Sequence, residues 1–341
     1  MNKVVLVTGG AGYIGSHAVV ELFEAGYTPV ILDDFRNAKP WIIDRIEQIT
    51  GKRPVHYPVD CQNESAVFEI MKKHSNAVGV IHFAADKAVG ESVKEPVRYY
   101  QNNVGSICVM LKGMEKFGIK NFVFSSSCTV YGEADDPVVT EETPVKKATS
   151  PYGDTKITCE KIVRYTYEAN SAFNAILLRY FNPIGAHPTA LIGELPQGVP
   201  NNLVPYITQT AKGIREKLTV FGDDYNTPDG TNIRDYIHVV DLAKAHVKAL
   251  AYLMKAETKQ FDVVNLGTGK GTSVLEIIKT FEEVNNLKLN YEIGPRREGD
   301  VEQIYANARK SKEVLGWECQ FSLKDALKHS WEWEQGIENL D

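Results

Sequence analysis

Three features are scarce or absent in this 341-residue chain, and each absence excludes a class of protein. The five cysteines are scattered and form no C-x-x-C pair, which favours reduced thiols in the cytoplasm over a disulfide framework or a metal site. Basic residues do not cluster and the net charge is −6, so we expect no nucleic-acid or membrane-surface partner. The first apolar run is too short for a signal peptide or a membrane span.

What the sequence does contain is an alternation of short apolar runs and amphipathic stretches. Hydrophobic residues make up 43% of the chain and charged residues 24%, as in ordinary globular proteins. The strongest predicted strands are KVVLVTG, YTPVILDD, AVGVIHFAA, KNFVFSSS and AFNAILLRYFN, with RPVHYPVD as a weaker one. Buried strands separated by helices predict an α/β fold: a doubly wound, Rossmann-like parallel sheet, followed by a smaller mixed α/β C-terminal domain.

The composition of the chain changes after about residue 182. Residues 183–202 and 222–232 are rich in proline and glycine and are predicted loops. A helical pattern and the apolar run FDVVNLG follow, so the chain is expected to return to the sheet. We therefore predict a dinucleotide-binding domain in residues 1–182, with 236–266 returning to it. Residues 183–235 and 267–341 form the second predicted domain.

Gly9, Gly12 and Gly15 occur at three-residue spacing in VTGGAGYIGSH, between a predicted strand and a predicted helix. In such a turn the first glycine permits tight bending, the second lets the backbone approach a pyrophosphate, and the third lets the helix pack on the strand. The next strand ends at Asp33, whose carboxylate can accept from ribose hydroxyls and repel a 2′-phosphate. This pattern favours NAD, although a nearby arginine leaves NADP open. The alternative interpretation is a surface turn beside solvated acids.

The stretch SPYGDTK predicts a helix that begins after Ser150, with Pro151 in its first turn. Tyr152 and Lys156 then lie one turn apart on the same face. A tyrosine that acts as a base near neutral pH needs its pKa of about 10 lowered by about 3 units, roughly 4 kcal/mol. A lysine ammonium and an oxidised nicotinamide can supply that energy, and Ser127 can relay the substrate's proton. A solvated helix face and a polar strand end are the alternatives.

Seven segments together carry a resemblance to a known family: TGGAGYIGSH, SSSCTVYG, SPYGDTK, RYFNPIGAHP, PNNLVPYI, RDYIHVVDLA and PRREGD. The chain resembles the UDP-glucose 4-epimerases, also called UDP-galactose 4-epimerases, of the extended short-chain dehydrogenase/reductase superfamily. The resemblance runs from about residue 3 to about residue 333. The glycine loop and the Tyr-Lys pair are typical of the whole superfamily, whereas RYFNPIGAHP and PRREGD are more specific to the epimerases.

The resemblance implies a cytoplasmic isomerase of galactose metabolism with tightly held NAD, which interconverts UDP-galactose and UDP-glucose. Sugar carbon 4 would be oxidised while Tyr152 takes the proton of the 4-hydroxyl. The 4-keto sugar would then rotate and receive the hydride on its other face. The implied catalytic residues are Tyr152, Lys156 and Ser127. A homodimer is also expected, because amphipathic helices near residues 92–117 and 150–170 can pair with their copies.

The resemblance also implies two sets of contact residues, which make the second domain a UDP-sugar-binding domain. The implied cofactor contacts are Gly9, Gly12, Tyr13, Ile14, Gly15, Asp33, Asp34, Phe35, Arg36, Asn37, Asp60, Cys61, Phe83, Ala84, Ala85, Lys87, Asn102, Ser127, Tyr152, Lys156, Tyr180 and Phe181. The implied substrate contacts are Lys87, Ser127, Tyr152, Phe181, Asn182, Asn202, Leu203, Phe221, Arg234, Arg297, Asp300 and Ile304. In this second set Arg234 and Arg297 suit a diphosphate, and Phe221 suits the uracil face.

Two positions leave questions open within the resemblance. Asp86 directly precedes Lys87 and is a candidate ion-pair partner that would weaken the hold of this lysine on the cofactor. Ile304 falls where the family has either a bulky tyrosine or a small residue at the edge of the sugar pocket. An isoleucine there predicts a wider pocket and some activity on UDP-N-acetylhexosamines, with Tyr305 as the alternative gate.

Two other functions are compatible with the same predicted fold. A sugar-nucleotide 4,6-dehydratase shares the 4-keto intermediate, but typically has Asp-Glu after the active-site hydroxyl, where this chain has Cys128 and Thr129. A non-catalytic dinucleotide sensor is expected to lack the Tyr-Lys pair, which this chain has. The sequence therefore favours the epimerase.

Overall fold

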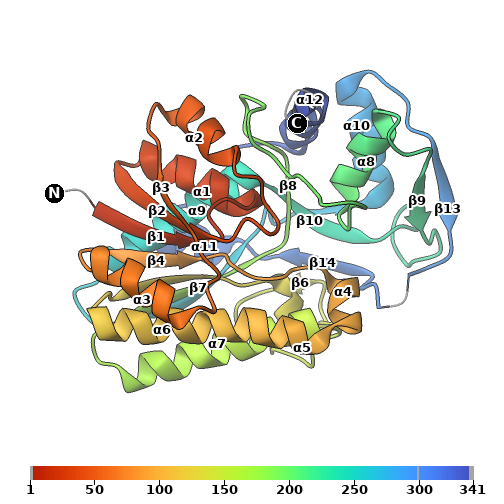
Figure 1. Cartoon of the computed structure of the whole chain (residues 1–341). Coiled ribbons are helices and arrows are strands. Elements are labelled where there is room, and N and C mark those ends of the chain that lie inside the picture. The colour runs from red at the N-terminus through yellow and green to blue at the C-terminus, as the bar shows by residue number, and fades with distance from the viewer. Residues whose placement is uncertain (1–2, 298, 338–341) are drawn as a thin grey trace.

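The structure is a computed structural model that describes residues 3–297 and 299–337. Figure 1 shows a large sheet with helices on both of its faces, and beside it a smaller region of helices and short strands. The large sheet has seven strands, all parallel, in the order β11-β7-β5-β4-β1-β2-β3. The strands are β1 Lys3–Thr8, β2 Tyr27–Asp33, β3 Val55–Pro58, β4 Gly79–His82, β5 Asn121–Ser125, β7 Asn174–Tyr180 and β11 Phe261–Leu266. This confirms the predicted doubly wound α/β fold.

Helices bury both faces of this sheet. Along β1, the fully buried Val5 and Val7 join one hydrophobic cluster, whereas the intervening Leu6 joins the other. Side chains alternate across a strand, so a strand covered on both sides is a continuous apolar run. Helices contributing to the first cluster are α1 Tyr13–Glu24, α2 Ile42–Thr50, α9 Val239–Met254 and α11 Arg309–Leu315. Helices contributing to the second are α3 Glu64–Lys73, α6 Gly105–Phe117 and α7 Pro151–Ala169.

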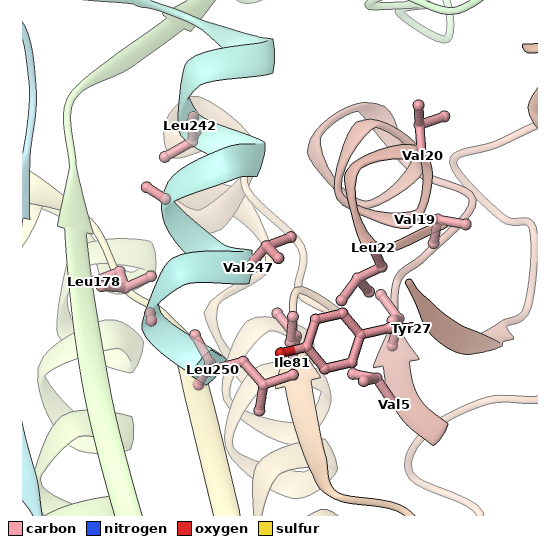
Figure 2. Packing of buried hydrophobic residues seen from close by; sticks show 14 of the residues in the cluster. Val5, Val19, Val20, Leu22, Tyr27, Ile81, Leu178, Leu242, Val247 and Leu250 are labelled. Carbon is pink, nitrogen blue, oxygen red and sulfur yellow. The ribbon is translucent and has the colours of Figure 1, made fainter. Parts of the chain in front are cut away.

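Figure 2 shows how α9 and α1 share the first cluster. Leu242, Val247 and Leu250 project from α9, and Leu22 projects from α1 toward the sheet residue Ile81. Four of these five side chains are fully buried, and each buried aliphatic side chain contributes about 1.5–3 kcal/mol to the free energy of unfolding. A helix formed after residue 238 is therefore part of the core of the N-terminal sheet.

The smaller region is organised around β10 Ile233–His238. This strand pairs with β12 Gly271–Ser273 on one side and, along different parts of its length, with β14 Gln303–Ala306 and β8 Asn182–Ile184. β14 in turn pairs with β6 Val138–Val139, and β9 Leu218–Phe221 pairs with β13 Tyr291–Gly294. The helices here are α8 Leu203–Ala211, α10 Val274–Asn285 and α12 Leu323–Gly336, which share a third hydrophobic cluster.

The segment expected to form one helix over residues 92–117 is divided. It consists of α4 Val89–Lys94, α5 Pro96–Tyr99, a π-helical turn Tyr100–Val104, and α6. Pro96 cannot donate a helical hydrogen bond and restricts the residue before it, so α4 ends and a new helix begins there. Residues 183–202 are largely irregular, as predicted, but begin within β8.

The predicted return of the chain to the sheet concerns residues 236–266. In the structure β11 pairs with β7 at the edge of the sheet, and α9 packs against α1. The exact domain boundaries predicted from the sequence remain a prediction. In the described ranges, 3–297 and 299–337, no helix combines the length and the apolar character needed to cross a membrane.

Candidate active site

The glycine loop lies at the point where the strand order of the sheet reverses. In the sheet, β1 lies between β2 and β4, so the chain continues to one side of β1 first and to the other side later. At such a switch point a crevice forms at the carboxyl ends of the strands. Gly9 has a φ of +66°, and a Cβ atom added to it would lie 2.8 Å from the Ala84 nitrogen, in the segment after β4. A Cβ at Gly15 would lie 2.0 Å from the Gly9 carbonyl oxygen. Both positions therefore require glycine, because a neighbouring backbone segment approaches each Cα too closely for a side chain.

The start of α1 presents backbone amides to this crevice. Gly12 is the N-cap residue and has no side chain with which to cap this helix end. An uncapped N-terminus with a glycine-lined approach suits a phosphate group. These features fit the dinucleotide that the sequence predicts.

The Asp33 carboxylate shapes the same crevice. Its Oδ2 accepts from the Ala11 amide at 2.9 Å, and its Oδ1 accepts from the Phe35 amide at 2.8 Å. Burial raises the pKa of Asp33, and these two amide hydrogen bonds oppose that shift. Asp33 therefore holds the glycine loop to the turn after β2, in addition to its predicted role toward a ribose.

Arg36, the residue that left NADP open, is engaged by neighbouring side chains. It forms an ion pair with Asp34 and another with Asp60 at 2.9 Å, and Nη1 donates to Asn102 Oδ1 at 3.4 Å. Two carboxylates beside one guanidinium oppose the binding of a further phosphate, which favours NAD. Further predicted cofactor residues begin α1 or follow the ends of sheet strands: Ile14 on α1, Asn37 after β2, Cys61 after β3, and Phe83, Ala84 and Ala85 after β4.

The predicted Tyr-Lys pair lies in the first turns of α7. Ser150 is the N-cap, as predicted, and its Oγ accepts from the Gly153 amide at 3.2 Å. Tyr152 and Lys156 are both buried. Lys156 Nζ donates to the Ser125 carbonyl oxygen at 2.8 Å and lies 5.9 Å from the centre of the Tyr152 ring. The lysine is thus fixed to the end of β5.

Burial dominates the protonation of these groups. Burial raises the pKa of Tyr152, Tyr180 raises it further, and a hydrogen bond with Ser127 lowers it. Burial lowers the pKa of Lys156 to about 8 and raises that of Tyr180 to about 12. The protein groups alone therefore do not make Tyr152 acidic. Its activation depends on the second part of the sequence argument, the positive charge of an oxidised nicotinamide.

Two further predicted residues lie at the ends of neighbouring strands. Ser125 Oγ donates to Tyr180 Oη at 2.9 Å, which joins the ends of β5 and β7. Ser127 follows β5, is buried, and accepts from the Thr129 amide at 3.2 Å. Tyr152, Ser127 and Tyr180 are therefore brought together from three separate elements.

Apart from Lys87, Ser127 and Tyr152, which also belong to the predicted cofactor set, the predicted substrate residues lie in or next to the smaller region. Arg234 on β10 is paired in register with Ile304 on β14. The Arg297 guanidinium lies 5.7 Å from the centre of the Phe221 ring and is 2.7 Å from the Asp300 carboxylate. Phe221 is 42% exposed, so its ring is accessible to a ligand. The other predicted substrate residues are Phe181 after β7, Asn182 at the start of β8, Asn202 as the N-cap of α8, and Leu203 at its first position.

The expected pairing of Asp86 with Lys87 is wrong. Asp86 is buried and its Oδ2 lies 3.5 Å from Arg98 Nε, whereas the side chain of Lys87 is 60% exposed and reaches Glu194 at 3.0 Å. The Asp86 amide donates to Asn103 Oδ1 at 2.8 Å, which fixes its backbone. The two neighbours therefore point into different environments, and Asp86 does not compete for Lys87.

The two candidate gate residues lie on opposite faces of β14. Ile304 is 6% exposed and packs in a cluster with Phe181 and Val130, next to the segment that carries Ser127. Tyr305 lies against Gly271 on the other face, where an added Cβ would be 3.0 Å from its ring. Of the two residues, Ile304 is therefore the one that faces the Ser127 segment, and its role at a sugar pocket remains a prediction.

Comparisons with known proteins agree with this geometry. Residues 6–330 match the family model described as GDP-mannose 4,6 dehydratase. The chain is 48% identical to a UDP-glucose 4-epimerase of Dictyostelium discoideum, with 97% of this chain and 95% of that protein covered. It is 47% identical to the UDP-glucose 4-epimerase of Bacillus subtilis, with 98% of each covered. The chain belongs to the UDP-glucose 4-epimerase family.

A solved member of the epimerase family has nearly the same structure. The UDP-glucose-4-epimerase of Stenotrophomonas maltophila, crystallised with NAD and formylated UDP-arabinopyranose, superposes with a TM-score of 0.96. It is 43% identical to this chain, and each chain is covered completely. The matching family model carries the name of a dehydratase, but the highly similar curated relatives reported above are named epimerases.

Sequence reasoning missed a buried ion pair next to the predicted catalytic residues. Glu160 on α7 and Arg179 on β7 are both buried and lie 2.7 Å apart. Ser126 Oγ donates to Glu160 Oε1 at 2.6 Å, so the pair also holds the end of β5. Glu160 lies one helical turn beyond Lys156, which was the available signal. Its partner is distant in sequence and adjacent only in the folded sheet.

Proposed function

We propose that the protein interconverts UDP-galactose and UDP-glucose by inversion at sugar carbon 4. The observation that carries this proposal is the burial of Tyr152 and Lys156 at the start of α7, close to Ser127 at the end of β5 and beside a switch-point crevice that suits a dinucleotide. The epimerase names of the relatives and the NAD in the neighbouring structure support it. Bound NAD supplies a reversible hydride acceptor at carbon 4, so that the reaction has no net redox change.

The residues of this chain have separate tasks in the proposed reaction. Tyr152 Oη takes the proton of the sugar 4-hydroxyl, with Ser127 hydrogen bonded to it, and returns the proton after the sugar has rotated. Lys156, fixed by the Ser125 carbonyl oxygen, contributes positive charge near the tyrosine. Arg234 and the Arg297–Phe221 pair bind the diphosphate and the uracil.

The proposed function is tested by incubating the purified protein with UDP-galactose and no added NAD. UDP-glucose is the expected product, because the cofactor is retained and regenerated in each turnover. A 6-deoxy-4-keto product supports the dehydratase instead. The absence of any product, also after NAD is added, supports the dinucleotide sensor.

Ile304→Tyr is expected to abolish epimerisation of UDP-N-acetylglucosamine and to change that of UDP-galactose by less than about threefold. Isoleucine is smaller than tyrosine and is therefore expected to leave space for an N-acetyl group on carbon 2. A tyrosine ring would fill that space, and overpacking costs about 1–3 kcal/mol. Initial rates with both substrates measure the ratio. Tyr305→Phe, on the other face of β14, is the control and should leave the ratio unchanged. If Ile304→Tyr also leaves it unchanged, Ile304 is not the gate.

The protein is further proposed to be a cytoplasmic homodimer. Val93 on α4, Val97 on α5 and Tyr165 on α7 are 62%, 68% and 67% exposed. Large apolar side chains on neighbouring helices suit an isologous interface with a second copy. The five cysteines are free thiols, which is typical of proteins in a reducing compartment.

Val97→Glu is expected to shift the protein from dimer to monomer, because it places a charge where an apolar surface is buried between copies. Light scattering at micromolar concentration measures the molar mass of the parent and the variant. Val55→Glu, at an exposed valine on β3, is the matched control and should remain dimeric. A monomeric parent contradicts the proposed interface.

A further inference from the structure

Glu194 joins two segments that are far apart in the sequence. Its Oε1 accepts from Lys87 Nζ at 3.0 Å and from Asn202 Nδ2 at 2.7 Å. Lys87 belongs to the segment after β4, next to the glycine loop, and Asn202 is the N-cap residue of α8 in the smaller region. One carboxylate oxygen therefore fixes a donor on the cofactor side and a donor on the sugar-nucleotide side.

The segment that carries Glu194 is itself held in place. The Glu194 side chain is 12% exposed, and its carbonyl oxygen accepts from Trp333 Nε1 at 2.9 Å. The preceding Gly193 forms a bridge with Ala186, and a Cβ added to Gly193 would lie 2.5 Å from the Trp333 ring. A cavity of about 10 Å³ lies between Tyr13, Glu194 and Trp333, about the space of one water molecule. The carboxylate therefore has little freedom to move.

Lys87 and Asn202 keep hydrogen-bonding capacity beyond the bonds to Glu194. An ammonium has three N–H donors, and an amide has two donors and one acceptor. The Lys87 side chain is 60% exposed and its Nζ lies 5.8 Å from the centre of the Tyr13 ring, at the start of α1. Its remaining donors are thus accessible to an anionic ligand near the uncapped end of that helix. Glu194 restricts the direction of these groups without occupying them completely.

We propose that Glu194 is a positioning residue that pre-orients Lys87 and Asn202 for the diphosphate-linked part of the sugar nucleotide. The inference rests on the proposed function for the identity of the ligand. Because Glu194 acts through its two partners, its charge contributes to binding and not to proton transfer at Tyr152. Loss of that charge lets two side chains move freely before the ligand binds, and their ordering then weakens affinity.

The test compares Glu194→Gln with the control Glu318→Gln. Glu318 lies in the loop after α11 and forms an exposed ion pair with Lys312 on α11 at 2.7 Å. Calorimetry on the NAD-loaded proteins measures the Kd for UDP, and initial rates give KM and kcat for UDP-galactose. Glu194→Gln is expected to raise Kd and KM about tenfold and to change kcat by less than about twofold. Glu318→Gln is expected to change none of the three values.

Lys87→Gln tests the same ion pair at an exposed side chain and keeps the proposal falsifiable if Glu194→Gln does not fold. This variant is expected to weaken UDP binding about tenfold. The double variant Lys87→Gln/Glu194→Gln should have a Kd for UDP within about threefold of that of Lys87→Gln alone. The proposal is overturned if the UDP affinity of either single variant stays within twofold of the parent, or if the two effects multiply. If the parent binds UDP but does not epimerise UDP-galactose, the proposed function fails, and the Kd comparison still decides the role of Glu194.

Discussion

Tyr152→Phe is expected to lower the turnover of UDP-galactose by about three orders of magnitude or more and to leave NAD bound. The substitution removes the hydroxyl that accepts the sugar proton and keeps the buried ring, which is 8% exposed. General acid–base catalysis contributes about 10²–10⁴-fold, and here the hydroxyl also connects the substrate to Ser127. Because the ring remains in the first turn of α7, the cofactor crevice should keep its shape.

The measurement is kcat for UDP-galactose, together with the NAD content of the purified variant. Tyr57→Phe is a matched control, because it also removes a tyrosine hydroxyl. Tyr57 lies on β3, and its hydroxyl is hydrogen bonded to His74 at 3.0 Å. This control should retain parental kcat. A kcat for Tyr152→Phe within tenfold of the parent contradicts the assignment of Tyr152 as the proton acceptor.

Gly15→Ala is expected to weaken the binding of NAD about 100-fold, so that the variant is purified largely without cofactor. The added Cβ would lie 2.0 Å from the Gly9 carbonyl oxygen, and this atom belongs to the backbone of the turn. Overpacking costs about 1–3 kcal/mol, and the upper end applies where the backbone itself must move. A cost of about 2.7 kcal/mol corresponds to about 100-fold in Kd.

The nicotinamide content after gel filtration and the Kd for added NAD measure this effect. Gly90→Ala is the matched control, because a Cβ at Gly90, on α4, meets no atom within 4 Å. The control should retain parental NAD content. Full NAD occupancy in Gly15→Ala means that the loop adapts at low cost, and that the close packing of Gly15 is not required for the cofactor.

The sequence predicted the large sheet well because most of its strands carry a local signal. A strand such as β1, with Val5, Leu6 and Val7 buried on alternating faces, appears as a continuous apolar run. The short strands of the smaller region carry no such signal. β12 and β14 are three and four residues long, and their pairing with β10 is decided by tertiary contacts. The exposed pattern of β13 likewise resembles a loop.

The candidate site divides in the same way. The Tyr152–Lys156 pair was predictable because both residues lie on one helix with a capping serine. The partners of Lys87 were not predictable, because side-chain direction decided between its neighbour Asp86 and the distant Glu194. Glu194 lies in an irregular segment rich in proline and glycine, where no periodicity marks a half-buried carboxylate.

The late position of β11 in the chain has a consequence for biosynthesis. β11 forms one edge of the sheet and ends at residue 266, whereas its partner strand β7 already ends at Tyr180. At about 5–20 residues per second, a ribosome leaves the β7 edge without its partner for roughly 4–17 s. For most of that interval the nascent chain also lacks a complete α9, so the apolar surface of α1 is open. Chaperones that recognise uncovered strand edges and apolar helix faces therefore have a defined window in which to act on this protein.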